Sequence, residues 1–307
     1  EQNIVIHSGK ALKRFKSGAS KIWRMIQAGV PANAAKVKTK TVSAAPCSED
    51  TTEGVLDTKA ITERGQRVHL APKSHVAEAY RTIRTAVFFG VPKGQAKTIV
   101  ITSPAPSDGK STLTSNLALA MAQAGQRTLV LDADFRKPVQ HKIFDIDHGK
   151  GLSSVFAGAV TLAEAIESGP VEGLDILPCG PEVPNPSEIL NSDAFANTLN
   201  DLVQRYDRVI IDSPPVTPVA DSQILAAICD VTLLVLRAEK STRRLSRHAR
   251  DSLLSVGGHL IGVVVNDVPQ RCGRYGYGRY GQYGNYGYYS HYGHYGYGRD
   301  ERQRQYA

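Results

Sequence analysis

One segment, TIVITSPAPSDGKSTLTSNLALAMA at residues 98–122, constrains the fold more than any other part of the chain. A short β-branched run at 98–102 predicts a buried strand, and a helical pattern follows at 111–124. The loop between them ends in GKS at 109–111. Backbone N–H groups of such a loop, together with the N-terminus of the following helix, form a binding site for phosphate. The segment therefore predicts a phosphate-binding loop between a strand and a helix.

This loop departs from the strict GxxxxGK[ST] pattern, because Pro104 stands where the first glycine is expected. The strand–loop–helix order still favours a phosphate site over a chance occurrence of GKS. We predict that the ammonium group of Lys110 reaches the β and γ phosphate oxygens and that the hydroxyl of Ser111 coordinates magnesium. The residues predicted to bind the nucleotide are Ser107, Asp108, Gly109, Lys110, Ser111, Thr112 and Asn266.

Three aspartates stand at the ends of apolar strands. Asp132 and Asp134 end TLVLDAD, and Asp212 ends RVIID. Because parallel strands end at one edge of a sheet, where open α/β sheets bind ligands, we expect all three beside the loop. Asp134 and Asp212, with Ser111, are the predicted magnesium ligands. A lone aspartate after a strand is usually a turn or cap residue, whereas three of them with GKS predict phosphoryl-transfer chemistry.

The fold class follows from apolar runs that alternate with helical patterns between about Lys73 and Pro269. Continuous apolar strands separated by helices predict an α/β fold of the P-loop NTPase type, with a mostly parallel sheet covered by helices on both faces. The predicted strands are 98–102, 128–134, 174–178, 208–212, 231–236 and 260–266, and the predicted helices include 111–124, 193–206 and 241–255.

The two ends of the 307-residue chain carry most of its formal charge of +8, which favours anionic partners. Residues 1–30 have one apolar helical stripe with lysines and arginines largely off it. This pattern predicts either a basic amphipathic helix on an anionic membrane or a helix docked on its own protein. Residues 31–72 are polar, small and proline-containing, which predicts a flexible linker before a domain at 73–269.

The last segment, 270–307, is of low complexity and almost free of aliphatic residues, which predicts disorder. It holds 11 of the 13 tyrosines. The tyrosines predicted to be phosphorylated are Tyr275, Tyr277, Tyr280, Tyr283, Tyr286, Tyr288, Tyr289, Tyr292, Tyr295 and Tyr297.

Cysteine usage and hydropathy exclude two classes of protein. The four cysteines show no CxxC spacing, which argues against a zinc or disulfide framework and fits a reducing compartment. No run of 18 apolar residues occurs, so the sequence predicts no membrane-spanning helix. Because the chain starts at Glu1, we also expect it to be part of a longer protein.

Taken in order, four motifs resemble those of the bacterial tyrosine kinases of capsule and exopolysaccharide synthesis. LVLDADFRKP is similar to the second aspartate motif of that family, VIIDSPPV to its Walker B strand, and GPEVPNPSEIL to its proline-rich stretch. EAYRTIR has the spacing of the ring-forming EX2RX2R motif, with Glu78, Arg81 and Arg84. That spacing puts one acid and two arginines on one side of a helix, which without the resemblance would predict only a solvated charged face.

The resemblance, which covers about Ser74 to Asp267 and the tail, implies an ATP- and Mg²⁺-dependent tyrosine autokinase that phosphorylates its own C-terminal tyrosines in a ring. It implies catalytic roles for Lys110, Asp132 and Asp134. Asp132 is either the general base for the tyrosine hydroxyl or an outer ligand of magnesium, and the sequence leaves both open. Expected partners are other copies of the chain, a membrane-embedded chain-length regulator in the same or a separate chain, and a cognate tyrosine phosphatase.

Two alternatives compete with this interpretation. A partitioning or positioning ATPase of the ParA/MinD type shares the fold, but it carries a signature lysine where this chain has Ala105. The Tyr-, Gly- and Arg-rich tail on its own also fits RNA binding. The kinase motifs in the same chain disfavour a nucleic-acid partner. The location implied by the resemblance is the cytoplasmic face of the bacterial inner membrane.

Overall fold

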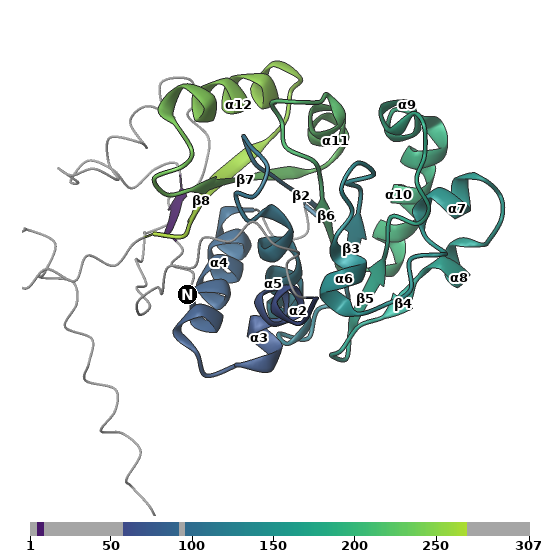
Figure 1. Ribbon diagram of the computed structural model, residues 1–307, viewed down its shortest axis with the longest axis horizontal. Helices are drawn as coiled ribbons and strands as arrows, with labels where there is room; N and C mark the ends of the chain where they lie inside the picture. The colour runs from purple at the N-terminus through teal and green to yellow at the C-terminus, as the bar shows by residue number, and fades with distance from the viewer. Residues whose placement is uncertain (1–4, 9–57, 92–95, 269–307) are drawn as a thin grey trace, which may run out of the picture. The chain divides into compact units, whose positions relative to one another are not determined.

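The computed structural model describes residues 5–8, 58–91 and 96–268 and contains one eight-stranded sheet (Figure 1). The strand order is β1-β8-β7-β2-β6-β3-β5-β4. Six strands are parallel: β2 (Thr98–Thr102), β3 (Thr128–Asp132), β5 (Leu174–Leu177), β6 (Arg208–Asp212), β7 (Val231–Arg237) and β8 (Leu260–Asn266). Two edge strands, β1 (Val5–Ser8) and β4 (Glu167–Ser168), are antiparallel. All six predicted strands form, and the predicted fold class is confirmed.

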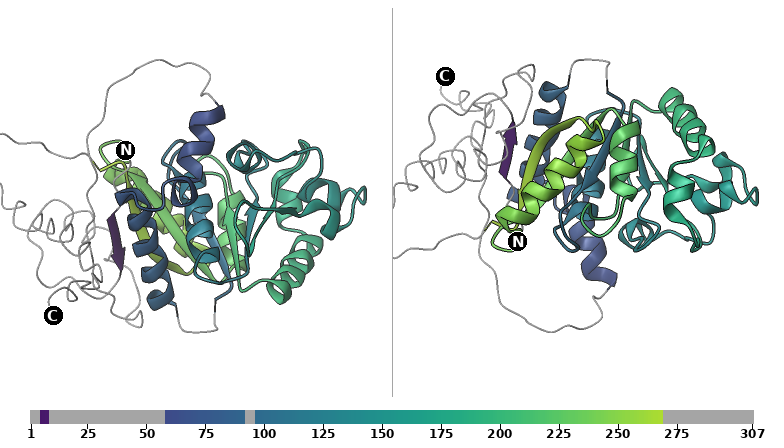
Figure 2. Two further views of the ribbon diagram at one scale, coloured as in Figure 1. Left: turned by 90° about the horizontal axis from the view of Figure 1, so that it is seen from below. Right: turned by 90° about the horizontal axis from the view of Figure 1, so that it is seen from above.

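Helices cover both faces of this sheet, as the two views of Figure 2 show for α4 and α12. One face carries α2 (Thr58–Gly65), α3 (Arg67–Leu70), α4 (His75–Gly90), α5 (Lys110–Ala122) and α6 (Gln140–Phe144). The other face carries α7 (Leu152–Phe156), α8 (Leu162–Ala165), α9 (Pro186–Leu190), α10 (Asp193–Arg205), α11 (Asp221–Ile228) and α12 (Arg243–Ser255).

The strands are apolar throughout because both of their faces are buried. Successive side chains of a strand point to opposite faces. In β2, Ile99 and Ile101 belong to the core beneath α4 and α5, whereas Val100 belongs to the core beneath α10. In β6 the same alternation places Ile210 in the core beneath α4 and α5, and Val209 and Ile211 in the core beneath α10. Every residue of β2 and β3 is buried, which explains the continuous runs in the sequence.

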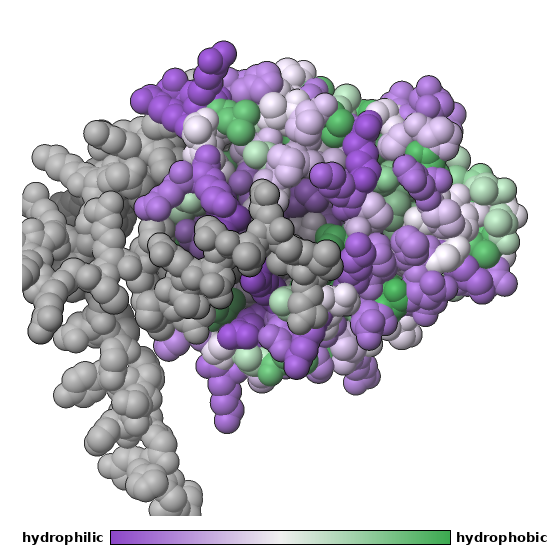
Figure 3. All heavy atoms as spheres, in the orientation of Figure 1, coloured by the Kyte–Doolittle hydropathy of each residue, from purple (hydrophilic) through white to green (hydrophobic). Residues whose placement is uncertain are grey.

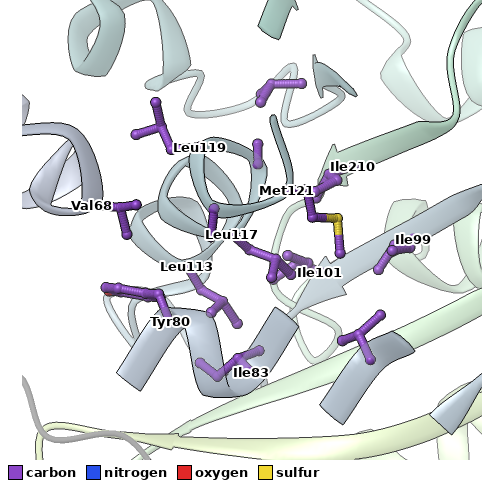
Figure 4. Packing of buried hydrophobic residues seen from close by; sticks show 14 of the residues in the cluster. Val68, Tyr80, Ile83, Ile99, Ile101, Leu113, Leu117, Leu119, Met121 and Ile210 are labelled. Carbon is purple, nitrogen blue, oxygen red and sulfur yellow. The ribbon is translucent and has the colours of Figure 1, made fainter. Parts of the chain in front are cut away.

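Helix α5 is the most enclosed helix of the described part of the chain, and it fixes the phosphate loop at its N-terminus. Eleven of its residues are buried, among them Lys110. Figure 4 shows Leu117 and Met121 toward the sheet and Leu113 beside Tyr80 of α4. A helix held on all sides keeps its first turn in a fixed position relative to the strand ends.

The exposed face shown in Figure 3 is mostly hydrophilic, with hydrophobic residues scattered over it.

The predicted linker at 31–72 is too long at its C-terminal end. Helices α2 and α3 occupy residues 58–70, and the side chain of Val68 is fully buried. The backbone N–H of Val68 donates to Asn116 Oδ1 at 2.9 Å, and Gln66 Nε2 donates to the carbonyl of Ile143 at 2.7 Å. The described helices therefore begin at Thr58, before the predicted boundary of the domain at Lys73. The polar composition of this segment misled the prediction because few apolar side chains anchor these short helices.

Other predictions for the two ends of the chain lie outside the described residues. These are the amphipathic stripe within 9–30, the linker up to residue 57 and the tyrosine-rich segment from 269 to the end. Within the segment predicted as helical, Val5–Ser8 instead forms β1, which pairs with β8 so that Val5 lies opposite Val265. No helix of the described residues is long and apolar enough to cross a membrane.

Candidate active site

The phosphate-binding loop runs from the end of β2 to Lys110, and its own polar groups hold it in place. Asp108 Oδ2 accepts the backbone N–H of Ala105 at 3.1 Å, and Ser103 Oγ donates to the carbonyl of Ala105 at 2.7 Å. Gly109 has a φ of +97°, a backbone conformation that is unfavourable for any residue with a Cβ atom. A Cβ atom there would lie 2.1 Å from Nδ2 of Asn266. Asn266 Nδ2 also donates to the carbonyl of Asp108 at 3.2 Å, so Asn266 braces the loop from β8.

Lys110 points from the first turn of α5 into a cluster of carboxylates. Its Nζ lies 2.7 Å from Oδ2 of Asp134 and 3.7 Å from Oδ1 of Asp212. Burial alone lowers the pKa of Lys110, but the charges of Asp212 and Asp134 outweigh it and raise the pKa above its ordinary value. Lys110 is therefore a buried cation at neutral pH. The strand ends of β3 and β6, which are neighbours in the sheet, supply the charges that keep it so.

Asp132 lies at the end of β3 and binds the loop that follows. Its Oδ1 accepts the N–H of Asp134 at 3.1 Å, and its Oδ2 accepts those of Val139 at 3.1 Å and Gln140 at 3.0 Å. The residue is fully buried. Burial and the charge of Asp212 raise the pKa of Asp132 to about 8, against the effect of the amide donor of Gln140. Asp132 thus combines a structural contact with a pKa near neutrality.

Asp134 and Asp212 face Lys110 from neighbouring strands. Oδ1 of Asp134 accepts the N–H of Lys137 at 3.0 Å. Burial raises the pKa of Asp212, and the charge of Lys110 opposes this. Oδ1 of Asp212 is buried and has no hydrogen-bond partner among the described residues. An unpaired carboxylate oxygen beside Ser111 suits Mg²⁺, which prefers oxygen ligands.

The described residues contain no group of three or more His, Cys, Asp or Glu side chains arranged to hold a metal by themselves. Mg²⁺ usually binds proteins through one or two carboxylates and completes its shell with water and substrate phosphates. The pair Asp134 and Asp212 with the hydroxyl of Ser111 fits this mode.

Comparisons with known proteins agree with this geometry. Residues 96–244 match the protein family described as AAA domain. CapB of Staphylococcus aureus, which is named as a tyrosine-protein kinase, is 40% identical over 202 residues, which are 66% of this chain and 89% of that protein. The tyrosine-protein kinase YwqD of Bacillus subtilis is 37% identical over 207 residues, which are 67% of this chain and 87% of YwqD. The chain belongs to the bacterial tyrosine-protein kinase family.

A solved structure supports the same assignment for the fold. The chimerical protein CapA2B2 is 41% identical to this kinase and superposes with a TM-score of 0.65 over 67% of this chain and 91% of that one. Other relatives are longer: the tyrosine-protein kinase etk of Escherichia coli is 32% identical over 200 residues, which are 65% of this chain but only 28% of etk.

The structure of this kinase brings most of the residues predicted for the active site together. Lys110, Asp134 and Asp212 are in contact, and Asp132 lies next to them. Asn266 meets the loop through Asp108 and Gly109, as described above. Ser107 is exposed, with a φ of +65°, and its carbonyl accepts a hydrogen bond from Arg237 at 3.3 Å.

The predicted triad Glu78, Arg81 and Arg84 is divided in the structure. Arg81 NH1 lies 2.8 Å from Oε2 of the exposed Glu78. Arg84 NH1 instead donates to the carbonyl of Ala120 on α5 at 2.8 Å, so part of the motif holds α4 to α5. The expectation of one shared charged surface therefore applies to Glu78 and Arg81 more than to Arg84.

The sequence interpretation missed two groups of residues at this edge of the sheet. Gln140 contacts Asp212 and the backbone of Ser111. Arg136 binds the buried Asp221, with Nε 2.8 Å from Oδ2, and Ser187 of the proline-rich segment donates to Asp221 Oδ1 at 2.5 Å. No spacing rule finds them, since a glutamine or arginine in a loop has no distinctive pattern. These contacts depend on how segments that are far apart in the sequence meet in the fold.

Proposed function

We propose that this chain is an ATP-dependent tyrosine autokinase that transfers the γ-phosphoryl group of ATP to tyrosines of its own segment 270–307. The observation that carries the proposal is Lys110, a buried cation held between Asp134 and Asp212 at the N-terminus of α5. Family membership selects tyrosine as the acceptor. The nucleotide phosphates would bind the loop from Ser103 to Thr112, whose N–H groups and helix N-terminus favour anions.

Magnesium would be held by Ser111, Asp134 and Asp212, where it supplies neutralising charge to the phosphates. Phosphoryl transfer depends mainly on positioning and on electrostatic stabilisation. With Mg-ATP bound, Lys110 would exchange its carboxylate contacts for phosphate oxygens. In the described structure, Asp134 and Asp212 compensate the charge of the buried Lys110.

Asp132 is the proposed base for the tyrosine hydroxyl, whose ordinary pKa is about 10. A base works best when its pKa lies near the operating pH, and the pKa of Asp132 is about 8. Its hydrogen bonds to three backbone amides also support the other role, in which Asp132 orders the metal site without accepting the proton.

Phosphorylation of the tail would act as a switch on assembly. Each phosphotyrosine adds about −1.5 to −2 charges at neutral pH. The ten proposed sites lie close together in the sequence, so their charges would repel one another and loosen a ring of subunits. Glu78 and Arg81 are the proposed contacts to the neighbouring subunit.

The proposed setting is the cytoplasmic face of the inner membrane, in capsule or exopolysaccharide synthesis. One relative is named for a cps region in Klebsiella pneumoniae, and this chain covers 33% of it. Proposed partners are a membrane-embedded chain-length regulator and a tyrosine phosphatase. Residues 1–30, which are basic and amphipathic in sequence, are proposed to contact the anionic membrane surface.

Intact-mass and peptide mass spectrometry after incubation with Mg-ATP tests the proposal. We expect phosphate on several tail tyrosines of the wild type and none on the Lys110→Met variant. Lys142→Met, which removes an exposed lysine of α6, is the matched control and should retain phosphorylation. ATP turnover without phosphotyrosine would favour a ParA/MinD-like ATPase, and a wild type without phosphotyrosine overturns the kinase proposal.

A further inference from the structure

Gln140 joins the ends of both acidic strands, β3 and β6, to the start of α5. Its backbone N–H donates to Asp132 Oδ2 at 3.0 Å. Its side-chain Nε2 donates to Asp212 Oδ2 at 2.8 Å and to the carbonyl of Ser111 at 3.1 Å. These partners come from β3, β6 and the first turn of α5. The side chain is fully buried, so no solvent competes for these bonds.

The orientation of the Gln140 amide follows from its partners. Both groups that Nε2 contacts are acceptors, a carboxylate and a carbonyl. The reverse orientation would place Oε1 against two acceptors, which is unfavourable. In the observed orientation Oε1 is buried without a hydrogen-bond partner in the described part of the chain. Burying a polar atom without a partner costs free energy of folding, so such atoms are rare in native proteins. A functional role of the Gln140 amide would account for this cost.

Gln140 leaves Asp212 with one occupied and one unoccupied oxygen. Oδ2 of Asp212 accepts the amide of Gln140, whereas Oδ1 is buried, lies 3.7 Å from Lys110 Nζ and has no hydrogen-bond partner among the residues that the structure describes. The amide thus sets the rotation of the carboxylate and presents Oδ1 toward the side of Lys110 and Ser111. The contact to the carbonyl of Ser111 fixes the first turn of α5 in the same frame.

We infer that Gln140 is a positioning residue that orients Asp212 and Ser111 for magnesium, an inference that rests on the proposed kinase function. Gln140 itself touches neither nucleotide nor metal in this scheme. Groups that orient metal ligands in this way typically change metal affinity or activity by about 10- to 100-fold when mutated.

The test measures magnesium binding rather than turnover. The thermal unfolding midpoint of the full chain is recorded with ADP in EDTA and with ADP over a range of Mg²⁺ concentrations. The half-saturating Mg²⁺ concentration should rise about 10- to 100-fold in Gln140→Met, which keeps the length of the side chain but removes the donor. Affinity for ADP in EDTA should change little.

Asn116→Leu is the matched control for loss of a buried amide. Asn116 lies on α5, accepts the N–H of Val68 and donates to the carbonyls of Arg64 and Thr112, away from the carboxylates. This variant should be destabilised yet keep the wild-type dependence on Mg²⁺. Equal half-saturating Mg²⁺ in Gln140→Met, Asn116→Leu and the wild type would overturn the inference while leaving the kinase proposal intact.

Gln140→Glu provides a second readout and a substitute if Gln140→Met does not fold. The introduced carboxyl has the same shape, but when ionised it repels Asp212 Oδ2, the acceptor of the amide that it replaces. As the pH falls, it becomes a neutral O–H donor to Asp212. The deficit in Mg²⁺ binding relative to the wild type should therefore shrink from pH 8 to pH 6, and a deficit independent of pH argues against positioning. A wild type that shows no Mg²⁺-dependent shift overturns both proposals.

Discussion

Gly109 shows how a single residue shapes the phosphate loop. Its φ of +97° and its contact with Asn266 each exclude a side chain. Gly125 also has a positive φ, of +82°, but no atom lies within 4 Å of the position that its Cβ would occupy. A substitution there therefore tests backbone strain without a steric contact. Gly125→Ala should cost about 1–2 kcal/mol of unfolding free energy from backbone strain alone.

Gly109→Ala should lower the unfolding free energy more than Gly125→Ala does, because Asn266 must also move. It should weaken ADP binding, whereas Gly125→Ala should leave binding unchanged. Urea unfolding and nucleotide titration check both points. Equal effects of the two substitutions on stability and binding would show that the contact with Asn266 is irrelevant.

The raised pKa of Asp132 predicts that the stability of the fold depends on pH. The pKa of its carboxyl is 3.8 in an ordinary environment and about 8 in the folded protein. Between these values the folded state holds a proton on Asp132 that the unfolded state lacks, so the contribution of Asp132 to stability falls as the pH rises from about 4 to 8. Asp132→Asn removes this titration, and its unfolding midpoint should therefore fall less steeply over that range.

The same variant tests the role of Asp132 in transfer. If the carboxylate is the base, Asp132→Asn should abolish most phosphotyrosine formation even at temperatures where the variant is folded. Retention of full autophosphorylation eliminates the base assignment. An unfolding midpoint whose pH slope matches the wild type would contradict the raised pKa.

Single residues differ in how well the sequence predicts them. Asp132, Asp134 and Asp212 were predictable because strand ends in a parallel sheet share one edge. Gln140 was not, because its role depends on the path of the loop that Asp132 binds. The ion pair of Arg136 with Asp221 escaped prediction for the same reason: 85 residues separate the partners in the sequence.

At the scale of elements, the strands were predictable because both sheet faces are buried and their sequences are continuously apolar. Helices α5, α10 and α12 were also predictable from their patterns. Helices α2 and α3 were not, because a four-residue helix such as α3 shows no periodicity. Its attachment depends on one buried valine and on the hydrogen bond from the Val68 N–H to the distant side chain of Asn116.

Val68 tests whether α3 is an integral part of the domain. Val68→Ala should lower the unfolding free energy by about 2 kcal/mol, since the side chain is fully buried. Leu70→Ala on the same helix is the control: Leu70 is 52% exposed, and the expected change is within about 0.5 kcal/mol. Chemical denaturation measures both. If the two variants are equally stable, α3 does not contribute to the core.

At the scale of the whole molecule, the resemblance of Glu78 and Arg81 to a ring-forming motif predicts an assembly. The side chain of Glu78 is 62% exposed, and a pair at i, i+3 contributes only about 0.2–0.5 kcal/mol to its own helix. Glu78→Ala should therefore leave the unfolding midpoint nearly unchanged while lowering the mass of the assembly in light scattering. Asp201→Ala, an exposed acid on α10, is the control and should change neither. An unchanged mass in Glu78→Ala contradicts a subunit contact through this residue.

The direction of phosphoryl transfer is the property that only the assembled protein can reveal. A Gly-rich chain of the 37 residues from Arg271 to Ala307 would span about 30–35 Å, enough to reach a neighbouring active site. Mixing a Lys110→Met chain with an active chain that lacks 270–307 separates donor from acceptor. Phosphate on the tail of the Lys110→Met chain demonstrates transfer in trans, and adding Glu78→Ala to both chains should slow it if the ring brings them together. Neither chain alone should gain phosphate on the tail. If the Lys110→Met chain stays unmodified in the mixture while the wild type phosphorylates itself, transfer occurs only within the chain that binds the nucleotide.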